Sequence, residues 1–135
     1  MKNLIQSIFY NKKVSKLDVD GEDLTKKHYS IIQEKKLLRS AYKTFYDEMS
    51  KSCDKYFKVE GLEIELGSGV GFFKSIRNSV ITSDIRKGFD YDMSVDATNM
   101  SIEDSSVKCF FAINVFHHIS HPTKFLNELN RVLKK

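Results

Sequence analysis

Proline, cysteine and tryptophan are scarce in this sequence, whose 135 residues include one Pro, two Cys and no Trp. A single proline excludes a proline-rich linker and a collagen-like repeat. The two cysteines, Cys53 and Cys109, lie far apart in the chain without a CxxC pair, so neither a disulfide framework nor a zinc knuckle is expected. The N-terminal residues make a poor signal peptide, and no apolar run approaches the ~18 residues of a membrane span. We therefore expect a cytoplasmic protein in a reducing compartment, with no membrane span.

The positive charge is unevenly placed along the chain, but no long run of one sign occurs. The net charge is +4, and the excess falls within the first 60 residues, where Lys alternates with Asp and Glu. Such interleaving favours a solvated helical face over a nucleic-acid surface, and only the pI near 9.0 suggests nucleic acid. We therefore expect no nucleic-acid partner. The length and the apolar content of 41% are ordinary for one soluble globular domain.

The pattern of apolar residues changes near residue 60. Residues 20–57 have helical spacing, with one predicted face made of Leu38, Tyr42, Phe45 and Met49. Beyond that point, strand-like runs alternate with helical ones. We expect strands at 62–66, 80–84, 93–96 and 107–114, and helices over 72–78 and after Pro122. The sequence thus predicts a helical arm or cap over 1–58 and an α/β domain over 59–135, built on an open, mostly parallel sheet with flanking helices.

The segment Glu65-Leu66-Gly67-Ser68-Gly69-Val70-Gly71 follows the first predicted strand. Glycines permit positive φ and a close approach of the backbone to a ligand, and a strand, a glycine-rich turn and a helix start are typical of a nucleotide-type site. A dinucleotide fingerprint needs a third glycine where Phe72 stands, and no Gly-Lys-Ser/Thr run is present. Dinucleotide and Walker-type phosphate sites are therefore disfavoured.

Acidic residues stand at the ends of the first three predicted strands, at Glu65, Asp84 and Asp96. Parallel strands place their carboxyl ends on one edge of the sheet, where open α/β folds bind ligands. A carboxylate at Asp84 suits the two hydroxyls of a ribose, and one at Asp96 suits an adenine amino group. The alternative is that Asp84 and Asp96 are ordinary turn residues at strand ends.

From about residue 61 to 135, the sequence resembles the class I S-adenosylmethionine-dependent methyltransferases. Glu65 to Gly71 is similar to the family's first motif, E/D-x-G-x-G-x-G. Asp84 is similar to the acidic residue after the second strand, and Asp96-Ala97 to the pair that contacts adenine. Residues 100–106, 114–119 and 125–134 match later family segments in the same order. A weaker resemblance, within residues 28–42, is to methyltransferases of bacterial surface-polysaccharide biosynthesis.

The resemblance implies a Rossmann-like fold, S-adenosyl-L-methionine as the cofactor and methyl transfer to a small-molecule or glycan acceptor. It implies that Glu65 orients the methionine amino group, that Asp84 binds the ribose and that Asp96 with Ala97 binds the adenine. The other implied cofactor-binding residues are Gly67, Ser68, Gly69, Gly71, Ile85 and Asn114.

His117 and His118 are the candidate acid–base residues of the predicted enzyme. The alternative is that one of them packs under the sheet and the other is solvated. His117 and His121 have the spacing of a helical metal clamp, but no third ligand is evident in the sequence, so no metal is expected.

Members of the family usually continue beyond the last helix into three further strands, whereas this sequence stops at Lys135. We therefore expect a fold truncated after the fourth strand and its following helix. An open strand edge is normally covered, so a second copy or a partner chain is expected there. Two functions follow: a methyltransferase, or a non-catalytic or partner-dependent remnant that binds the cofactor.

Overall fold

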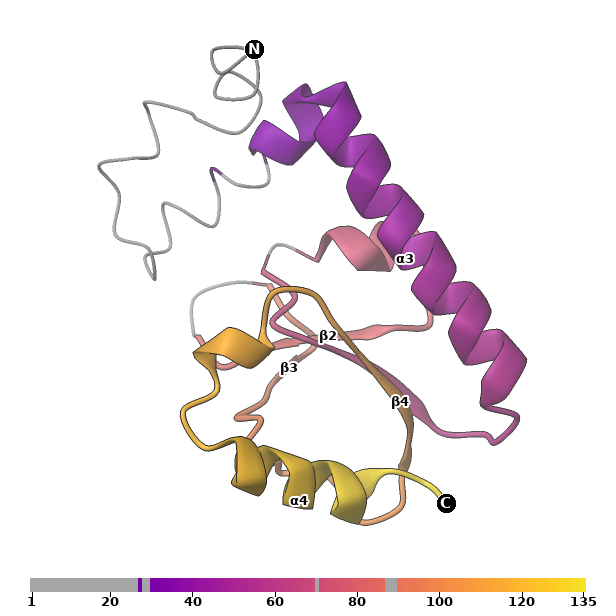
Figure 1. Cartoon of the computed structure of the whole chain (residues 1–135), viewed down its shortest axis with the longest axis vertical. Coiled ribbons are helices and arrows are strands. Elements are labelled where there is room, and N and C mark those ends of the chain that lie inside the picture. Colours follow the sequence, from indigo (N-terminus) through magenta and orange to yellow (C-terminus); the bar gives the residue numbers. More distant parts are fainter. Residues whose placement is uncertain (1–26, 28–29, 70, 87–89) are drawn as a thin grey trace.

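A four-stranded sheet lies at the centre of the structure, a computed structural model that describes residues 27, 30–69, 71–86 and 90–135. All paired strands are parallel, in the order β3-β2-β1-β4. Figure 1 shows helices α3 (Lys36–Tyr56) and α4 (Pro122–Val132) flanking these strands. The prediction of an α/β, Rossmann-like fold with a parallel sheet is confirmed. The strands are β1 (Leu62–Leu66), β2 (Ile81–Asp84), β3 (Met93–Ser94) and β4 (Val107–Ala112).

The strand register brings the carboxyl ends of the strands to one edge of the sheet. Leu66, the last residue of β1, lies opposite Ser83 in β2 and Ala112 in β4. Asp84, the last residue of β2, lies opposite Ser94 in β3. Because all four strands run in the same direction, the segments that follow them leave the sheet at this edge.

Helix α3 covers one face of the sheet, and its buried side chains recur at a heptad spacing. Tyr46 and Cys53 are 6% and 2% exposed. The predicted helical spacing is confirmed over the described part of 20–57, but the predicted apolar face was wrong at Phe45, which is 56% exposed. Residues on the sheet and its connections complete this half of the core: Phe72, Phe73, Val80, Cys109 and Phe111.

Helix α4 covers the opposite face and is tied to the segment that precedes β4. Pro122 begins the helix, where its missing N–H removes no intrahelical hydrogen bond. The Arg131 guanidinium donates 2.8 Å hydrogen bonds to the carbonyls of Met100 and Ile102. The buried cluster on this face consists of Ile64, Leu66, Val95, Met100, Ile102, Val107 and Val132.

The connection between β1 and β2 differs from the prediction. Residues 72–78 were expected to be helical, but only a 3₁₀ turn, η1 (Phe72–Ser75), forms there. The Arg77 guanidinium donates two 2.7 Å hydrogen bonds to the Glu63 carboxylate, which turns the chain back toward β1. The third and fourth strands also end earlier than predicted, at Ser94 and Ala112.

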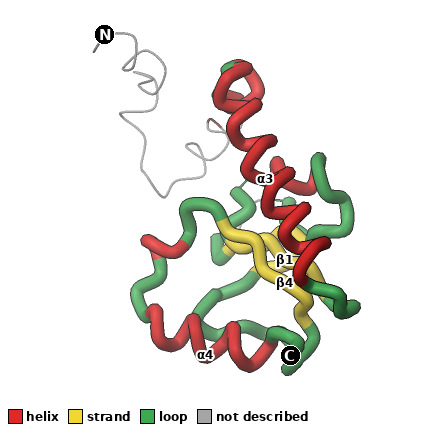
Figure 2. Tube along the Cα trace, turned by 45° about the vertical axis from the view of Figure 1, so that its right-hand side comes forward, coloured by secondary structure: helices red, strands yellow, loops and turns green. Residues whose placement is uncertain are grey.

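Helix α3 packs directly on the strands, as Figure 2 shows for β1 and β4. The predicted boundary between an arm over 1–58 and a domain over 59–135 stays a prediction, since residues 1–26 lie outside the described part. Strand β4 pairs with β1 on one side. On its other side, Val107 forms a parallel bridge with Leu133, and no described strand pairs with the rest of that side. No helix within the described ranges is long and apolar enough to cross a membrane.

Candidate functional site

The carboxyl edge of the sheet collects most of the predicted site residues. Glu65 lies near the end of β1, the glycine loop follows it, and Asp84 ends β2. The amide of Gly69 donates a 3.4 Å hydrogen bond to Oδ2 of Asp84, which places this carboxylate against the loop. Asn114 leaves β4 at the same edge. Residues far apart in the sequence therefore converge where a parallel sheet binds ligands.

All three predicted glycines adopt left-handed backbone conformations, with φ of 64°, 57° and 69° at Gly67, Gly69 and Gly71. Gly67 has a second constraint, because a Cβ atom added there would lie 2.6 Å from Cγ2 of Val115. Side-chain-bearing residues rarely adopt this φ, and the loop after β4 leaves no room for one at Gly67. The loop is thus fitted closely against the segment that follows β4.

Ser68 fixes this loop to β2. Its backbone N–H donates to the Ser83 carbonyl at 2.9 Å. Its hydroxyl accepts from the Ser83 N–H at 2.9 Å and donates to the Glu65 carbonyl at 3.1 Å. The Ser68 side chain is buried, and its hydrogen bonds hold the loop against the ends of β1 and β2. Its assignment as a cofactor-binding residue stays a prediction.

Asp84 presents a buried, negatively charged group at the end of β2. Its exposed fraction is 4%, and the Arg86 guanidinium donates hydrogen bonds to its two oxygens at 3.0 and 2.8 Å. Burial acts to raise the pKa of Asp84, but the hydrogen bonds from Arg86 and from the Gly69 amide outweigh it and lower the pKa. The Asp84 carboxylate is therefore ionised at neutral pH. The next residue, Ile85, is 62% exposed.

Glu65 presents a second buried carboxylate, near the end of the strand that leads into the loop. The hydroxyl of Tyr46 donates a 2.7 Å hydrogen bond to its Oε1 atom, while Oε2 is buried with no partner among the described residues. Burial raises the pKa of Glu65 to about 6, although the bond from Tyr46 opposes the rise. An unsatisfied, buried carboxylate oxygen favours a ligand that brings a donor or a positive charge.

Tyr46 is a site residue that sequence reasoning missed. It lies on α3, and its ring stacks on Phe73 with centroids 4.3 Å apart. The only sequence signal was the heptad spacing between Tyr46 and Cys53, which the aromatic residues at positions 42 and 45 obscured.

Asp96 and Ala97 lie beyond β3, which ends at Ser94. Asp96 is exposed, and its Oδ1 accepts 2.8 Å hydrogen bonds from the backbone N–H and the hydroxyl of Thr98. Ala97 is half-buried. The Asp96 carboxylate therefore closes a turn, as the alternative interpretation expected, and its role toward adenine stays a prediction.

The segment after β4 carries the remaining candidates. Asn114 has a φ of 58°, a left-handed conformation that asparagine tolerates better than most residues. His117 and His118 lie in the short turn η2 (Phe116–His118), with ring centroids 4.0 Å apart. Both are exposed, so the alternative in which one of them packs under the sheet is wrong. In the described part of the chain, no side-chain hydrogen bond orients either imidazole.

Comparison with known proteins covers this same region. Residues 64–135, just over half of the chain, match the family model described as a methyltransferase domain. No curated protein matches the chain, and no solved structure does so. The matched residues run from β1 to α4 and contain all the predicted site residues.

Proposed function

The chain belongs to the methyltransferase domain family, and we propose that it binds S-adenosylmethionine and transfers a methyl group to a small-molecule or glycan acceptor. One observation carries the proposal: at the carboxyl edge of a parallel sheet, a loop of left-handed glycines follows one buried carboxylate, Glu65, and donates a hydrogen bond to another, Asp84. A ligand with a cationic amino group and a ribose diol matches this pair of carboxylates.

The residues of this edge fit the cofactor. Glu65 has a buried Oε2 atom that has no partner among the described residues, which suits the methionine ammonium group. Asp84 suits the ribose hydroxyls once Arg86 moves away from its oxygens. We assign the adenine to Asp96, Ala97 and the exposed side chain of Ile85. The methionine end is assigned to Gly67, Ser68, Gly69, Gly71 and Asn114.

The bound cofactor supplies an electrophilic methyl group on a sulfonium centre. The chain's contribution is to hold that group in line with the acceptor, and orientation of this kind is worth ~7–11 kcal/mol of a reaction barrier. A base is needed only where the acceptor loses a proton as it attacks. His117 and His118 are the candidates for that step, and both are accessible to an acceptor.

The second proposed function is cofactor binding without turnover, or turnover that depends on a partner. The favouring observation is the edge position of β4, where no described strand pairs with the outer side beyond the bridge between Val107 and Leu133. A second copy or a partner chain would cover that edge and complete the acceptor site. We place either form in the cytoplasm, without nucleic acid or a metal as a requirement.

Calorimetric titration with S-adenosylhomocysteine tests the cofactor site directly. We expect saturable binding, no binding of NAD, and at least a tenfold loss of affinity in Asp84→Ala. A folded chain that does not bind S-adenosylhomocysteine would refute the proposed function. Transfer of labelled methyl groups to candidate acceptors then distinguishes the two forms, since the second binds the cofactor but transfers nothing unless a partner is present.

A further inference from the structure

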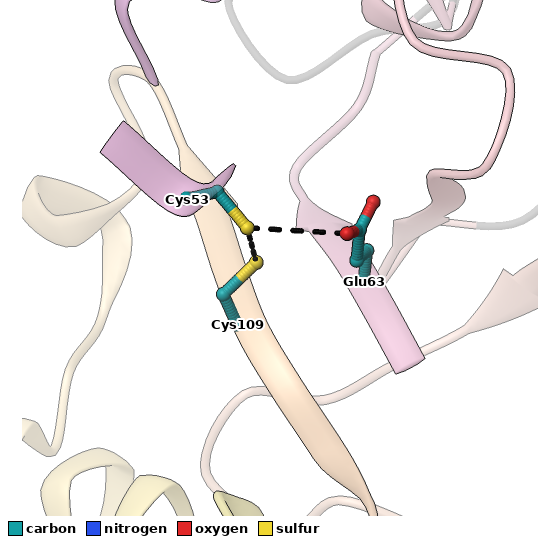
Figure 3. Close-up of side chains that lie close together, drawn as sticks. All are labelled: Cys53, Glu63 and Cys109. Carbon is teal, nitrogen blue, oxygen red and sulfur yellow. Dashed lines mark hydrogen bonds between the residues drawn. The ribbon is translucent and has the colours of Figure 1, made fainter. Parts of the chain in front are cut away.

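Two cysteines that are remote in the sequence lie side by side in the fold. Cys53 projects from α3 and Cys109 from β4, and their sulfur atoms are 2.8 Å apart (Figure 3). Both are free thiols, and both side chains are buried. The sequence separation predicted no relationship between them, so this contact is a product of how α3 docks on the sheet.

The separation of the two sulfur atoms is close to that of a covalent bond. A disulfide bond is about 2.0 Å long, so the atoms need to approach by only ~0.8 Å. We propose that Cys53 and Cys109 are a redox site, which forms a reversible intrachain disulfide between α3 and β4 when the chain meets a peroxide.

The charges around the pair disfavour a bound metal ion. Glu63 lies nearby, with Oε1 3.9 Å from the Cys53 sulfur, and these three residues form the single group of potential metal ligands in the described ranges. However, the Glu63 oxygens already accept hydrogen bonds from Lys108 at 2.8 Å and from Arg77 at 2.7 Å. A divalent cation here would face two fixed positive charges, and the carboxylate that would have to bind it is already held by both.

The two thiols differ in their surroundings, which gives them different roles. An open cavity of about 300 Å³ is lined by Cys53 together with Met49, Ser52, Phe57 and Phe110, so a small oxidant can reach Cys53. Cys109 does not line this cavity, and burial raises the pKa of its thiol above the ordinary value. Cys53 is therefore the attacking group and Cys109 the resolving one.

The proposed chemistry consumes one hydrogen peroxide for each disulfide formed. The Cys53 thiol loses its proton as its sulfur attacks one peroxide oxygen, the O–O bond breaks, and the departing hydroxide takes that proton to become water. Cys53 is then a sulfenic acid. The Cys109 sulfur attacks the Cys53 sulfur, the S–O bond breaks, and the leaving hydroxide takes the Cys109 proton as a second water. Both sulfurs are oxidised and both peroxide oxygens are reduced.

The disulfide would fix the helix that supports the candidate site. Cys53 lies two helical turns beyond Tyr46, the residue that holds Glu65, and both face the sheet. The proposal does not depend on the proposed function, because the cysteines and the oxidant alone define it.

The test is peroxide treatment of the 135-residue chain, followed by denaturation, alkylation and intact mass measurement. We expect the two alkylatable thiols to disappear and the mass of the non-alkylated chain to fall by about 2 Da, both reversed by dithiothreitol. A peptide map without reductant should join the fragments that carry Cys53 and Cys109. The oxidised chain should also melt roughly 5–10 °C higher, because the link constrains the unfolded state.

Other outcomes would overturn the proposal. Two unreacted thiols, oxygen adducts on separate cysteines, or disulfide-linked dimers would each show that the pair does not close within one chain. A melting temperature that is not raised would show that the link forms only by distorting the fold. Cys53→Ala and Cys109→Ala are matched controls, in which no intrachain link forms. If either variant fails to fold, the mass and peptide map of the parent chain still show whether the disulfide forms.

Discussion

The hydroxyl of Tyr46 donates a 2.7 Å hydrogen bond to Oε1 of Glu65, and this contact joins helix α3 to the end of β1. Both side chains are buried. Burial raises the pKa of Tyr46 well above its ordinary value, and the nearby Glu65 carboxylate adds to the rise, so the phenol keeps its proton and acts as the donor. A helix outside the family match thus positions a carboxylate inside it.

Replacing Tyr46 with phenylalanine tests this positioning role. The ring packing is kept, but Oε1 of Glu65 loses its donor in a buried site, so we expect a loss of about 1–3 kcal/mol in the free energy of unfolding. We also expect weaker binding of S-adenosylhomocysteine. Urea unfolding and calorimetry measure the two effects.

Tyr42→Phe is the matched control for Tyr46→Phe. Tyr42 lies one turn earlier on α3 with its ring 6.3 Å from that of Tyr46, and its hydroxyl bonds to no described residue. Its replacement should leave both measurements nearly unchanged. Equal effects of the two substitutions would contradict a specific role for the Tyr46 hydroxyl.

The raised pKa of Glu65 should make the free energy of unfolding depend on pH. Its pKa is about 6 in the fold against an ordinary 4.5, so the folded chain binds more protons than the unfolded chain between those values. Stability from this group therefore falls as pH rises through roughly 4.5–6, by about 2 kcal/mol in total. Glu65→Gln should remove that component, so the variant gains stability relative to the parent chain between pH 4.5 and 7. A difference between the two chains that does not change with pH would contradict the raised pKa.

The glycine loop allows a prediction with a built-in comparison. Gly67→Ala and Gly71→Ala both place a side chain at positive φ, but only the new Cβ at position 67 meets Val115, at 2.6 Å. We expect Gly67→Ala to lose about 2–4 kcal/mol and Gly71→Ala about 1–2 kcal/mol in the free energy of unfolding. Adding Val115→Ala to Gly67→Ala should improve its binding of S-adenosylhomocysteine. The same loss at both positions would show that the close contact with Val115 has no effect.

Local patterns in the sequence predicted the four strands and the glycine loop, although β3 and β4 end two residues earlier than predicted. Apolar alternation around Ile64 and the spacing of Gly67, Gly69 and Gly71 depend on neighbouring residues alone, so they can be recognised without the fold. The parallel sheet then followed from the alternation of strands and helical segments. The convergence of Glu65 and Asp84 at one edge was predictable for the same reason.

Contacts that depend on docking were not predictable from the sequence. The pairing of Tyr46 with Glu65 and of Cys53 with Cys109 requires the rotation of α3 on the sheet, which helical spacing does not determine when apolar residues occupy several faces. The expected helix over 72–78 was wrong because the bonds between Arg77 and Glu63 override a weak local preference. The Asp84–Arg86 pair also went unnoticed, since neighbouring charges in a sequence rarely indicate which of them bind each other.

The contribution of Glu63 to the free energy of unfolding should change with pH in the direction opposite to that of Glu65. Hydrogen bonds from the Arg77 guanidinium, against the effect of burial, lower the pKa of Glu63 to about 2. Its contribution to stability is therefore present above its ordinary pKa of 4.5 and is lost as pH falls toward 2. Arg77→Met should lower the free energy of unfolding by about 2–4 kcal/mol at pH 7, because it leaves a buried carboxylate short of partners.

The effect of Arg77→Met should shrink at pH 3, where Glu63 no longer has to stay charged once its partner is removed. Lys43→Met is the matched control, since it breaks an exposed pair with Asp47 and should cost less than about 0.5 kcal/mol at either pH. Urea titrations of the three chains at both pH values provide the comparison. If Arg77→Met lowers the free energy of unfolding as much at pH 3 as at pH 7, its effect comes from lost packing of the arginine side chain and not from the charge of Glu63.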